Sequence, residues 1–313
     1  MFRQQSGEGN GLKAMVLAAG RGKRMAPLSD DLPKPLMDVG GETLIGLRLE
    51  ALARAGIVDC VINVSYKKEA IMEAVGDGAR YGVRARYSVE PEALETAGGV
   101  AQALPLLGDG AFVAVNADVF TDCPMSLLAQ WARALDAAAA SARLGGKRPK
   151  ALAALVLAPN PDFKPQGDFA LEGAGSEADP SPGDPNGLEQ WDAPDPQNAV
   201  GGAPERAAGA RDELDWDGLS GLARLIRKED AAPGAMTYTF SGMGAYRPEF
   251  FASVKRGEPC PLLIPLLEAL GRGQVWAVAR RGLWMDVGTP GRLAQARAIR
   301  ARPSDPPSDL GAR

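Results

Sequence analysis

Residues 14–36 read AMVLAAGRGKRMAPLSDDLPKPL, and this stretch decides the fold. A short apolar strand ending at Leu17 runs directly into a turn, 18–22, whose residues are Ala or Gly at every position but 21. Two cations follow, the second being Arg24, and Lys34 stands between two prolines. Small residues let backbone N–H groups approach a ligand, cations neutralise phosphate charge, and flanking prolines stiffen the chain around a lysine. The stretch therefore predicts a loop that holds a polyphosphate beyond a buried strand.

Three other phosphate-binding motifs do not fit. A Walker loop requires Ser or Thr after its Gly-Lys pair, whereas the pairs at 22–23 and 146–147 are both followed by Arg. A dinucleotide fingerprint requires a third glycine where the chain has Met25, and prolines interrupt the helix that should follow. The protein-kinase motifs require histidine, and the chain contains none. A tight turn with solvated cations is the remaining alternative, and it does not explain the spacing from Arg24 to Lys34.

The stretch from Leu17 to Leu36 resembles the signature of the sugar-nucleotidyltransferase family, L-A-A-G-x-G-x-R-[ML]-x-P-L-[ST]-x-x-x-P-K-P-L. The resemblance continues in YSVEPEALETAGGVAQALPLLGDGAFVAVNADVFTD (87–122), TFSGMGAY (239–246) and WMDVGTPGRL (284–293). Within the family these segments look most like the uridylyltransferases that act on N-acetylmuramate 1-phosphate in bacterial cell-wall recycling. The resemblance implies a nucleotide-diphospho-sugar transferase fold and transfer of a nucleotidyl group from an NTP to a sugar 1-phosphate.

The composition limits the available chemistry. The 313 residues are enough for a sizeable core, and 45% hydrophobic with 24% charged residues is ordinary for a globular protein. No uninterrupted apolar stretch approaches a membrane span, and three widely spaced cysteines fit a reducing compartment, so we expect a cytoplasmic protein. The absence of histidine excludes Ser-His-Asp and Cys-His catalysis and His-ligated zinc. A metal on carboxylate oxygens would be a hard ion, which favours Mg²⁺.

The net charge of −4 is unevenly distributed. Residues 173–222 contain eleven acidic residues and two arginines, so the rest of the chain is mildly basic. This balance suits a small anionic substrate, whereas nucleic acid requires denser basic stripes. The acidic stretch is rich in Pro and Gly, and we interpret it as a disordered insertion in one nucleotidyltransferase domain over 13–302, with tails at 1–12 and 303–313. We expect no nucleic acid, membrane or obligate protein partner.

Strand and helix patterns alternate along the chain. Apolar or alternating runs predict the strands, and apolar residues at helical spacing predict the helices. Strands are expected at 15–17, 58–66, 83–90, 111–118, 151–159, 237–247 and 274–280, and helices at 44–55, 67–78, 97–107, from 124, at 262–270 and at 290–302. This order predicts a doubly wound, mixed and mostly parallel α/β sheet of the Rossmann-like kind, with ligands beyond the carboxyl ends of its strands.

Two aspartates are the candidates for holding Mg²⁺. Asp118 ends the apolar strand VAVNAD, and Asp286 lies in WMDVGTP, where a strand meets a glycine turn. In the family that the chain resembles, aspartates matching these positions coordinate the metal. Either residue alone could instead cap a helix, since a proline follows closely in both cases.

The catalytic residues are predicted to be Arg24, Lys34 and Asp118. Nucleotidyl transfer depends on positioning and on neutralising phosphate charge. A planar guanidinium suits the β- and γ-phosphates, so we expect Arg24 there. We expect the ammonium of Lys34 to lie against the α-phosphate or the sugar phosphate.

The candidate substrate-binding residues form two sets. The nucleotide set is Leu17, Ala18, Ala19, Gly20, Gly22, Arg24, Glu90, Glu95, Thr96 and Gly98. By resemblance, Glu90 stands where the family contacts the base edge with Gln or Glu, and Glu95 stands where the family usually has Gly. The sugar set is Asn116, Asn160, Asp168, Ser241 and Gly242, chosen as hydroxyl or acetamido contacts.

The resemblance favours UTP and N-acetylmuramate 1-phosphate as substrates. The alternatives within the class are a mannose-1-phosphate guanylyltransferase and a glucose-1-phosphate nucleotidyltransferase. A phosphocholine cytidylyltransferase shares the loop, but it requires an aromatic or acidic cage for the quaternary ammonium, and the sugar region has no dense aromatic cluster. A non-catalytic nucleotide-sugar sensor would be expected to lose Arg24, Lys34 or one aspartate, and all four residues are present.

Overall fold

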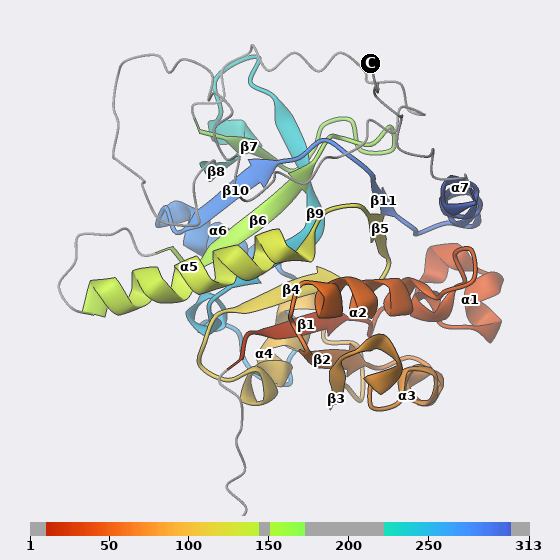
Figure 1. Cartoon of the computed structure of the whole chain (residues 1–313). Helices are drawn as coiled ribbons and strands as arrows, with labels where there is room; N and C mark the ends of the chain where they lie inside the picture. Colours follow the sequence, from red (N-terminus) through yellow and green to blue (C-terminus); the bar gives the residue numbers. More distant parts are fainter. Residues whose placement is uncertain (1–10, 144–150, 173–221, 302–313) are drawn as a thin grey trace, which may run out of the picture.

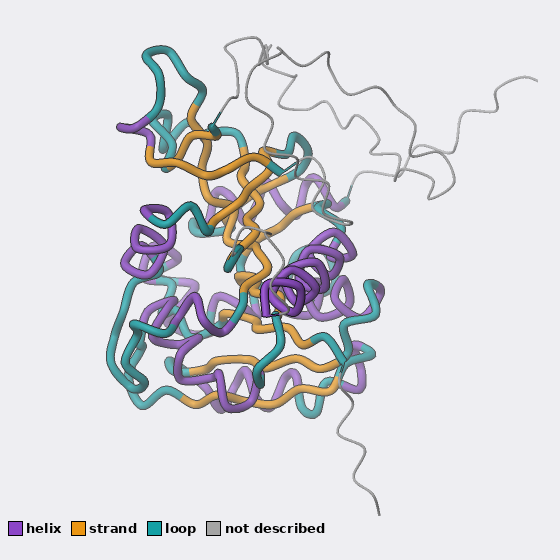
Figure 2. The backbone as a smooth tube through the Cα atoms, turned by 90° about the vertical axis from the view of Figure 1, so that its left-hand side faces the viewer, coloured by secondary structure: helices purple, strands orange, loops and turns teal. Residues whose placement is uncertain are grey.

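The computed structural model describes residues 11–143, 151–172 and 222–301. Within these ranges a nine-stranded sheet has the order β3-β2-β1-β4-β9-β6-β10-β8-β7, and helices lie on both of its faces (Figure 1, Figure 2). The pairings give seven of these strands one direction, and β8 and β9 the opposite one. The predicted mixed, mostly parallel α/β sheet is confirmed.

The first half of the chain builds the parallel part of the sheet. Its strands are β1 (Lys13–Leu17), β2 (Asp59–Val64), β3 (Arg84–Val89) and β4 (Phe112–Asn116). Its helices are α1 (Leu28–Asp31), α2 (Leu44–Arg54), α3 (Lys68–Val75), α4 (Glu95–Leu107) and α5 (Met125–Arg143), and a short 3-10 turn, η2 (Lys34–Leu36), precedes α2. All four strands were predicted within a few residues, because each combines an apolar run with flanking turn residues.

The second half adds strands of both directions. These are β6 (Ala153–Ala158), β7 (Phe169–Leu171), β8 (Ala223–Arg227), β9 (Thr237–Tyr246) and β10 (Val275–Ala279), with helices α6 (Leu263–Gly271) and α7 (Pro290–Arg300). β9 lies between β4 and β6 and pairs antiparallel with both, so it joins the two halves of the sheet. The sequence did not predict β7 and β8, because runs this short have no clear periodicity.

A separate two-stranded sheet positions the site. It joins β5 (Val119–Thr121) to β11 (Trp284–Asp286), two segments far apart in the chain. Asp286 lies opposite Val119 in this antiparallel pair, and the N–H of Val287 donates to the carbonyl of Asp118 at 3.0 Å. The pairing therefore fixes Asp118 and Asp286 side by side.

The core is divided between the two faces of the sheet. Along β1, Ala14 and Val16 belong to the cluster that includes α2, α3 and α5, whereas Met15 belongs to the cluster with α4 and α6. Because both faces are covered, the central strands are apolar at nearly every position. This packing leaves the carboxyl ends of the strands as the place where polar side chains gather.

The insertion at 173–222 and both tails lie almost wholly outside the described residues, and the domain boundaries remain a prediction. The helix predicted at 97–107 begins two residues earlier, at Glu95. No capping side chain marks its start, so no local pattern indicated the first residue. Among the helices of the described ranges, none is long and apolar enough to cross a membrane.

Candidate functional site

A cavity of about 380 Å³ opens beyond the carboxyl ends of β1 and β4, where doubly wound sheets bind ligands. Most of the predicted site residues line it, namely Leu17, Ala18, Ala19, Gly20, Gly22, Arg24, Lys34, Glu95, Thr96, Asn116 and Asp118. The predicted residues that do not line it are Glu90, Gly98, Asn160, Asp168, Ser241, Gly242 and Asp286. The structure thus brings together the loop, the start of α4 and the end of β4.

The loop after β1 presents its backbone to this cavity. Among the described residues, the N–H groups of residues 19–22 have no hydrogen-bond acceptor. Gly22 has φ +64°, and a Cβ atom there would lie 3.1 Å from the Cβ atom of Lys34, so the turn requires glycine. Successive unpaired N–H groups form a concave anion site. The loop can therefore hold phosphate oxygens.

Asn63 fixes the start of this loop, and the sequence analysis missed it. Its Oδ1 accepts from the N–H of Ala18 at 2.8 Å, and its Nδ2 donates to Glu90 at 2.7 Å. The second oxygen of Glu90 accepts from the N–H of Leu94 at 2.8 Å. Burial raises the pKa of Glu90 despite these two hydrogen bonds. Asn63 lines the cavity, whereas Glu90 lies behind its wall. The sequence signal that could have indicated Asn63 is a polar residue within an otherwise apolar strand.

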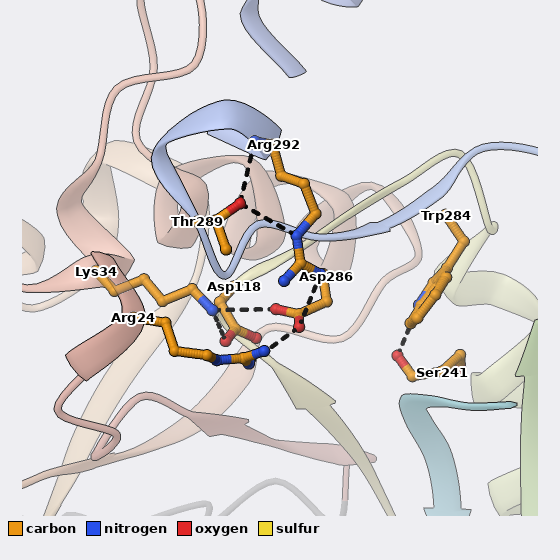
Figure 3. A network of polar contacts seen from close by, with 8 residues as sticks. All are labelled: Arg24, Lys34, Asp118, Ser241, Trp284, Asp286, Thr289 and Arg292. Carbon is orange, nitrogen blue, oxygen red and sulfur yellow. Dashed lines mark hydrogen bonds and ion pairs between the residues drawn. The ribbon is translucent and has the colours of Figure 1, made fainter. Parts of the chain in front are cut away.

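Lys34 lies between the two aspartates (Figure 3). Its ammonium contacts the carboxylate of Asp118 and lies 3.1 Å from Oδ1 of Asp286. The Lys34 side chain is only 8% exposed, because η2 packs against α2. An ammonium this buried is held in place by its carboxylate partners. The structure therefore brings Lys34 together with the two carboxylates, an arrangement that the sequence did not predict.

Two guanidinium groups converge on the other oxygen of Asp286. Arg24 donates to Oδ2 at 3.4 Å and is 65% exposed, whereas Arg292 donates at 3.2 Å and is 16% exposed (Figure 3). Arg292 is fixed by Thr289, whose Oγ1 accepts from its Nε at 3.4 Å, and by the ring of Phe163, 4.4 Å away. The sequence indicated a helix start near Pro290, but no local pattern indicated that Arg292 returns to Asp286.

These cations keep Asp286 ionised. Burial raises the pKa of this carboxyl, but the charges of Lys34, Arg292 and Arg24 outweigh burial, and the pKa is lowered below its ordinary value of 3.8. The carboxylate is therefore charged throughout the neutral range.

The donor set fits a divalent cation. Asp118 and Asp286 offer hard carboxylate oxygens, and the ammonium of Lys34 shows that their oxygens converge on one point where a positive charge is stable. Within the described ranges no three His, Cys, Asp or Glu side chains form a metal-binding group. Mg²⁺ is often held by one or two carboxylates while substrate phosphates and water complete its shell, and the residues present fit that pattern.

Glu95 opens α4 in an unusual backbone conformation. Its φ of +57° lies in the left-handed region that favours glycine. This explains why a glycine is usual here in the family that the sequence resembles. Gly98, one turn on, does not face the cavity: a Cβ atom there would lie 2.5 Å from the carbonyl oxygen of Glu258.

The predicted sugar residues are mostly engaged within the protein. Asn116 lines the cavity, and Gly242 lies against its side chain. The Oγ of Ser241 donates to Val156 at 2.7 Å. Asn160 contacts Thr237 and Thr239, and Asp168 accepts from the N–H of Phe240 at 3.0 Å. In this structure Asn160 and Asp168 hold a loop, and their contact with a sugar stays a prediction.

Comparison with known proteins is consistent with this geometry. The family model described as nucleotidyl transferase matches residues 13–151. The chain is 38% identical over 290 residues to the N-acetylmuramate alpha-1-phosphate uridylyltransferase of Neisseria meningitidis serogroup B, covering 92% of this chain and 98% of that protein. It is 38% identical over 123 residues to the mannose-1-phosphate guanyltransferase of Aspergillus fumigatus, covering 38% of this chain and 34% of that one.

Solved structures share the fold at low identity. A candidate glucose-1-phosphate thymidylyltransferase from Bacillus anthracis, in complex with sucrose, gives a TM-score of 0.61 at 17% identity, covering 92% of this chain and 95% of that one. HddC from Yersinia pseudotuberculosis, complexed with GMP-PN, gives 0.56 at 14% identity, covering 92% and 99%. The relatives, the family model and the fold together define the class: the chain is a nucleotidyltransferase, a kind of transferase. The similarity along nearly the whole chain narrows this class: the chain belongs to the sugar-1-phosphate nucleotidyltransferase family.

Proposed function

We propose that this enzyme transfers the uridylyl group of UTP to N-acetylmuramate 1-phosphate, with Mg²⁺ as its cofactor. The observation that supports this substrate pair is the extent of similarity. The muramate uridylyltransferase matches 92% of the chain, whereas the guanyltransferase matches only 123 residues. Most of the residues that we assign to sugar binding lie in the second half of the chain. A match that covers nearly the whole chain therefore supports the choice of sugar better than a match over 123 residues.

The loop and Arg24 are proposed to bind the triphosphate. Ala19, Gly20 and Gly22 line the cavity, and the N–H groups of residues 19–22, which have no acceptor among the described residues, would donate to phosphate oxygens. The Arg24 guanidinium is mostly exposed beside Asp286, so it is free to turn toward the β- and γ-phosphates. Its role is to stabilise pyrophosphate as that group leaves.

Lys34 and the two aspartates are proposed to serve the α-phosphate. Asp118 and Asp286 would hold Mg²⁺, which when bound neutralises phosphate charge. Lys34, released from one or both carboxylates, would lie against the α-phosphate or the sugar phosphate. An oxygen of the sugar phosphate forms a bond to the α-phosphorus, the bond from that phosphorus to the bridging oxygen breaks, and pyrophosphate leaves with the electron pair.

No general base is needed for this reaction. The attacking group is a phosphate monoester whose second pKa is about 6, so it is already ionised near neutral pH. A chain without histidine is compatible with such chemistry. We further propose a role in bacterial cell-wall recycling in the cytoplasm, where UTP is available.

The test is pyrophosphate release by the wild-type enzyme with Mg²⁺. ATP, CTP, GTP and UTP are each crossed with the 1-phosphates of N-acetylmuramate, N-acetylglucosamine, glucose and mannose. Release only with UTP and N-acetylmuramate 1-phosphate is the expected result. Release with a different pair would keep the mechanism and replace the substrates, whereas no release with any pair would favour a sensor or another phosphorylated alcohol.

A further inference from the structure

Arg48 is a buried arginine without a carboxylate partner in the described ranges. It lies on α2 and is 3% exposed. One Nη atom donates to the carbonyl of Val119 at 2.5 Å, and the other lies 3.8 Å from the sulfur of Met125. Its Nε has no acceptor among the described residues. Burial lowers the pKa of its guanidinium to about 10. A buried, unpaired charge is unfavourable for folding, so its presence requires another explanation.

A second buried arginine shows the contrast. Arg247 is 4% exposed, but two of its nitrogens donate to Glu249 at 2.9 and 3.0 Å, and it also contacts Asp136. The charge of Arg247 is therefore balanced by two carboxylates, as expected for an arginine in a structural ion pair. Arg48 differs because its best hydrogen bond goes to a backbone carbonyl beside the site.

The Val119 carbonyl occupies a critical position. Val119 follows Asp118 directly and lies opposite Asp286 in the β5–β11 pair. On the β11 side, the Asp118 carbonyl accepts a hydrogen bond from the N–H of Val287. The Val119 carbonyl instead accepts a hydrogen bond from Arg48. Arg48 therefore holds β5 from the side opposite β11. α2 also packs against η2, which begins at Lys34.

We propose that Arg48 is a positioning residue, which fixes the separation of the Asp118 and Asp286 carboxylates through its hydrogen bond to the Val119 carbonyl. Its buried positive charge also favours the binding of an anionic substrate beside β5. This inference rests on the proposed metal site and deepens it. Substitution of a residue that orients metal ligands typically weakens metal affinity or activity by about 10- to 100-fold. The fold, in contrast, gains little from an unpaired charge.

The experiment compares Arg48→Met with Arg48→Lys and with Arg247→Met as the matched control. Unfolding by urea gives stability, electron paramagnetic resonance of free Mn²⁺ gives metal affinity without turnover, and kinetics give kcat and KM. We expect Arg48→Met to be at least as stable as wild type, with Mn²⁺ affinity weaker by about tenfold or more and kcat lowered. Arg48→Lys should recover part of the affinity. Arg247→Met should lose stability while, where folded, keeping Mn²⁺ affinity.

Two results would overturn the inference. One is Mn²⁺ affinity and kcat of Arg48→Met within twofold of wild type. The other is a loss of stability in Arg48→Met as large as in Arg247→Met, which would make Arg48 purely structural. A wild-type protein that binds no Mn²⁺ would instead remove the proposed metal site, and the inference with it, so the two failures are distinguishable.

Discussion

Lys34 Nζ lies 3.1 Å from Oδ1 of Asp286, a residue from the opposite half of the chain, and the same ammonium also contacts Asp118 (Figure 3). One buried cation therefore stands where two carboxylates converge. A divalent cation that binds these carboxylates must compete with Lys34, and the displaced ammonium becomes available to phosphate. In the proposed mechanism, binding of the metal and release of Lys34 toward phosphate are thereby linked.

Replacing Lys34 by Met should separate these two functions. We expect kcat/KM to fall by about 10²- to 10³-fold, because phosphate charge is no longer neutralised by the lysine. Mn²⁺ affinity, measured without substrate, should rise because the ammonium no longer competes. Lys255→Met, at a lysine that is 78% exposed, is the control and should change neither quantity by more than about twofold. Near-normal turnover or weaker Mn²⁺ binding in Lys34→Met would contradict this account.

The lowered pKa of Asp286 predicts a pH dependence of stability. Because the folded-state pKa lies below the ordinary value of 3.8, the ionised carboxylate stabilises the fold above that value, and this contribution disappears as pH falls through the folded-state pKa. Asp286→Asn should therefore be less stable than wild type at pH 5–8, and the difference should shrink below about pH 3.8. Urea unfolding of both proteins across pH 3–8 measures this. A difference that stays constant down to pH 3 would show that the cations do not act on Asp286.

Arg24 and Arg292 both contact Asp286, but we expect their alanine variants to differ in stability and in kcat/KM. Arg24→Ala should leave the free energy of unfolding within about 0.5 kcal/mol of wild type, since an exposed ion pair contributes little, while kcat/KM falls by about 100-fold. Arg292→Ala should lower the free energy of unfolding by about 1–2 kcal/mol, because it also loses Thr289 and the Phe163 ring. Thermal unfolding and steady-state kinetics of both variants distinguish them. Full turnover by Arg24→Ala would remove its assigned role.

Glu95→Gly should stabilise the protein. The left-handed backbone at Glu95 is unfavourable for a residue with a Cβ atom, so glycine should raise the free energy of unfolding by about 0.5–1 kcal/mol. Glu92→Gly is the matched control, because Glu92 has no positive φ, and it should be neutral or destabilising. Urea unfolding gives both values. Equal effects at the two positions would mean that the conformation of Glu95 is not strained.

The sequence predicted the features that are encoded locally. The loop from Leu17, the lysine between prolines and the helical periodicities all lie within short stretches, and the structure contains them. Asp118 and Asp286 were each recognisable from their motifs. Their pairing was not, because β5 is only three residues long and meets β11 through tertiary contacts.

Residues whose role depends on packing were not predictable. Asn63, Arg292 and Arg48 act on the site from neighbouring elements, and no local pattern records which group each one contacts. Asn160 and Asp168 do not line the cavity, and their contact with a sugar stays a prediction. Their polar side chains are used to hold the loop that precedes β7, so polarity alone did not indicate a cavity-lining position.

The central claim is tested most directly by ³¹P NMR of the wild-type protein with UTP, N-acetylmuramate 1-phosphate and Mg²⁺, beside Asp118→Asn. We predict that the wild-type protein consumes both substrates and produces a diphosphate diester and pyrophosphate in equal amounts. Asp118→Asn should leave the spectrum nearly unchanged over the same time. Unchanged substrates with the wild-type protein, or equal product formation by Asp118→Asn, would contradict the account.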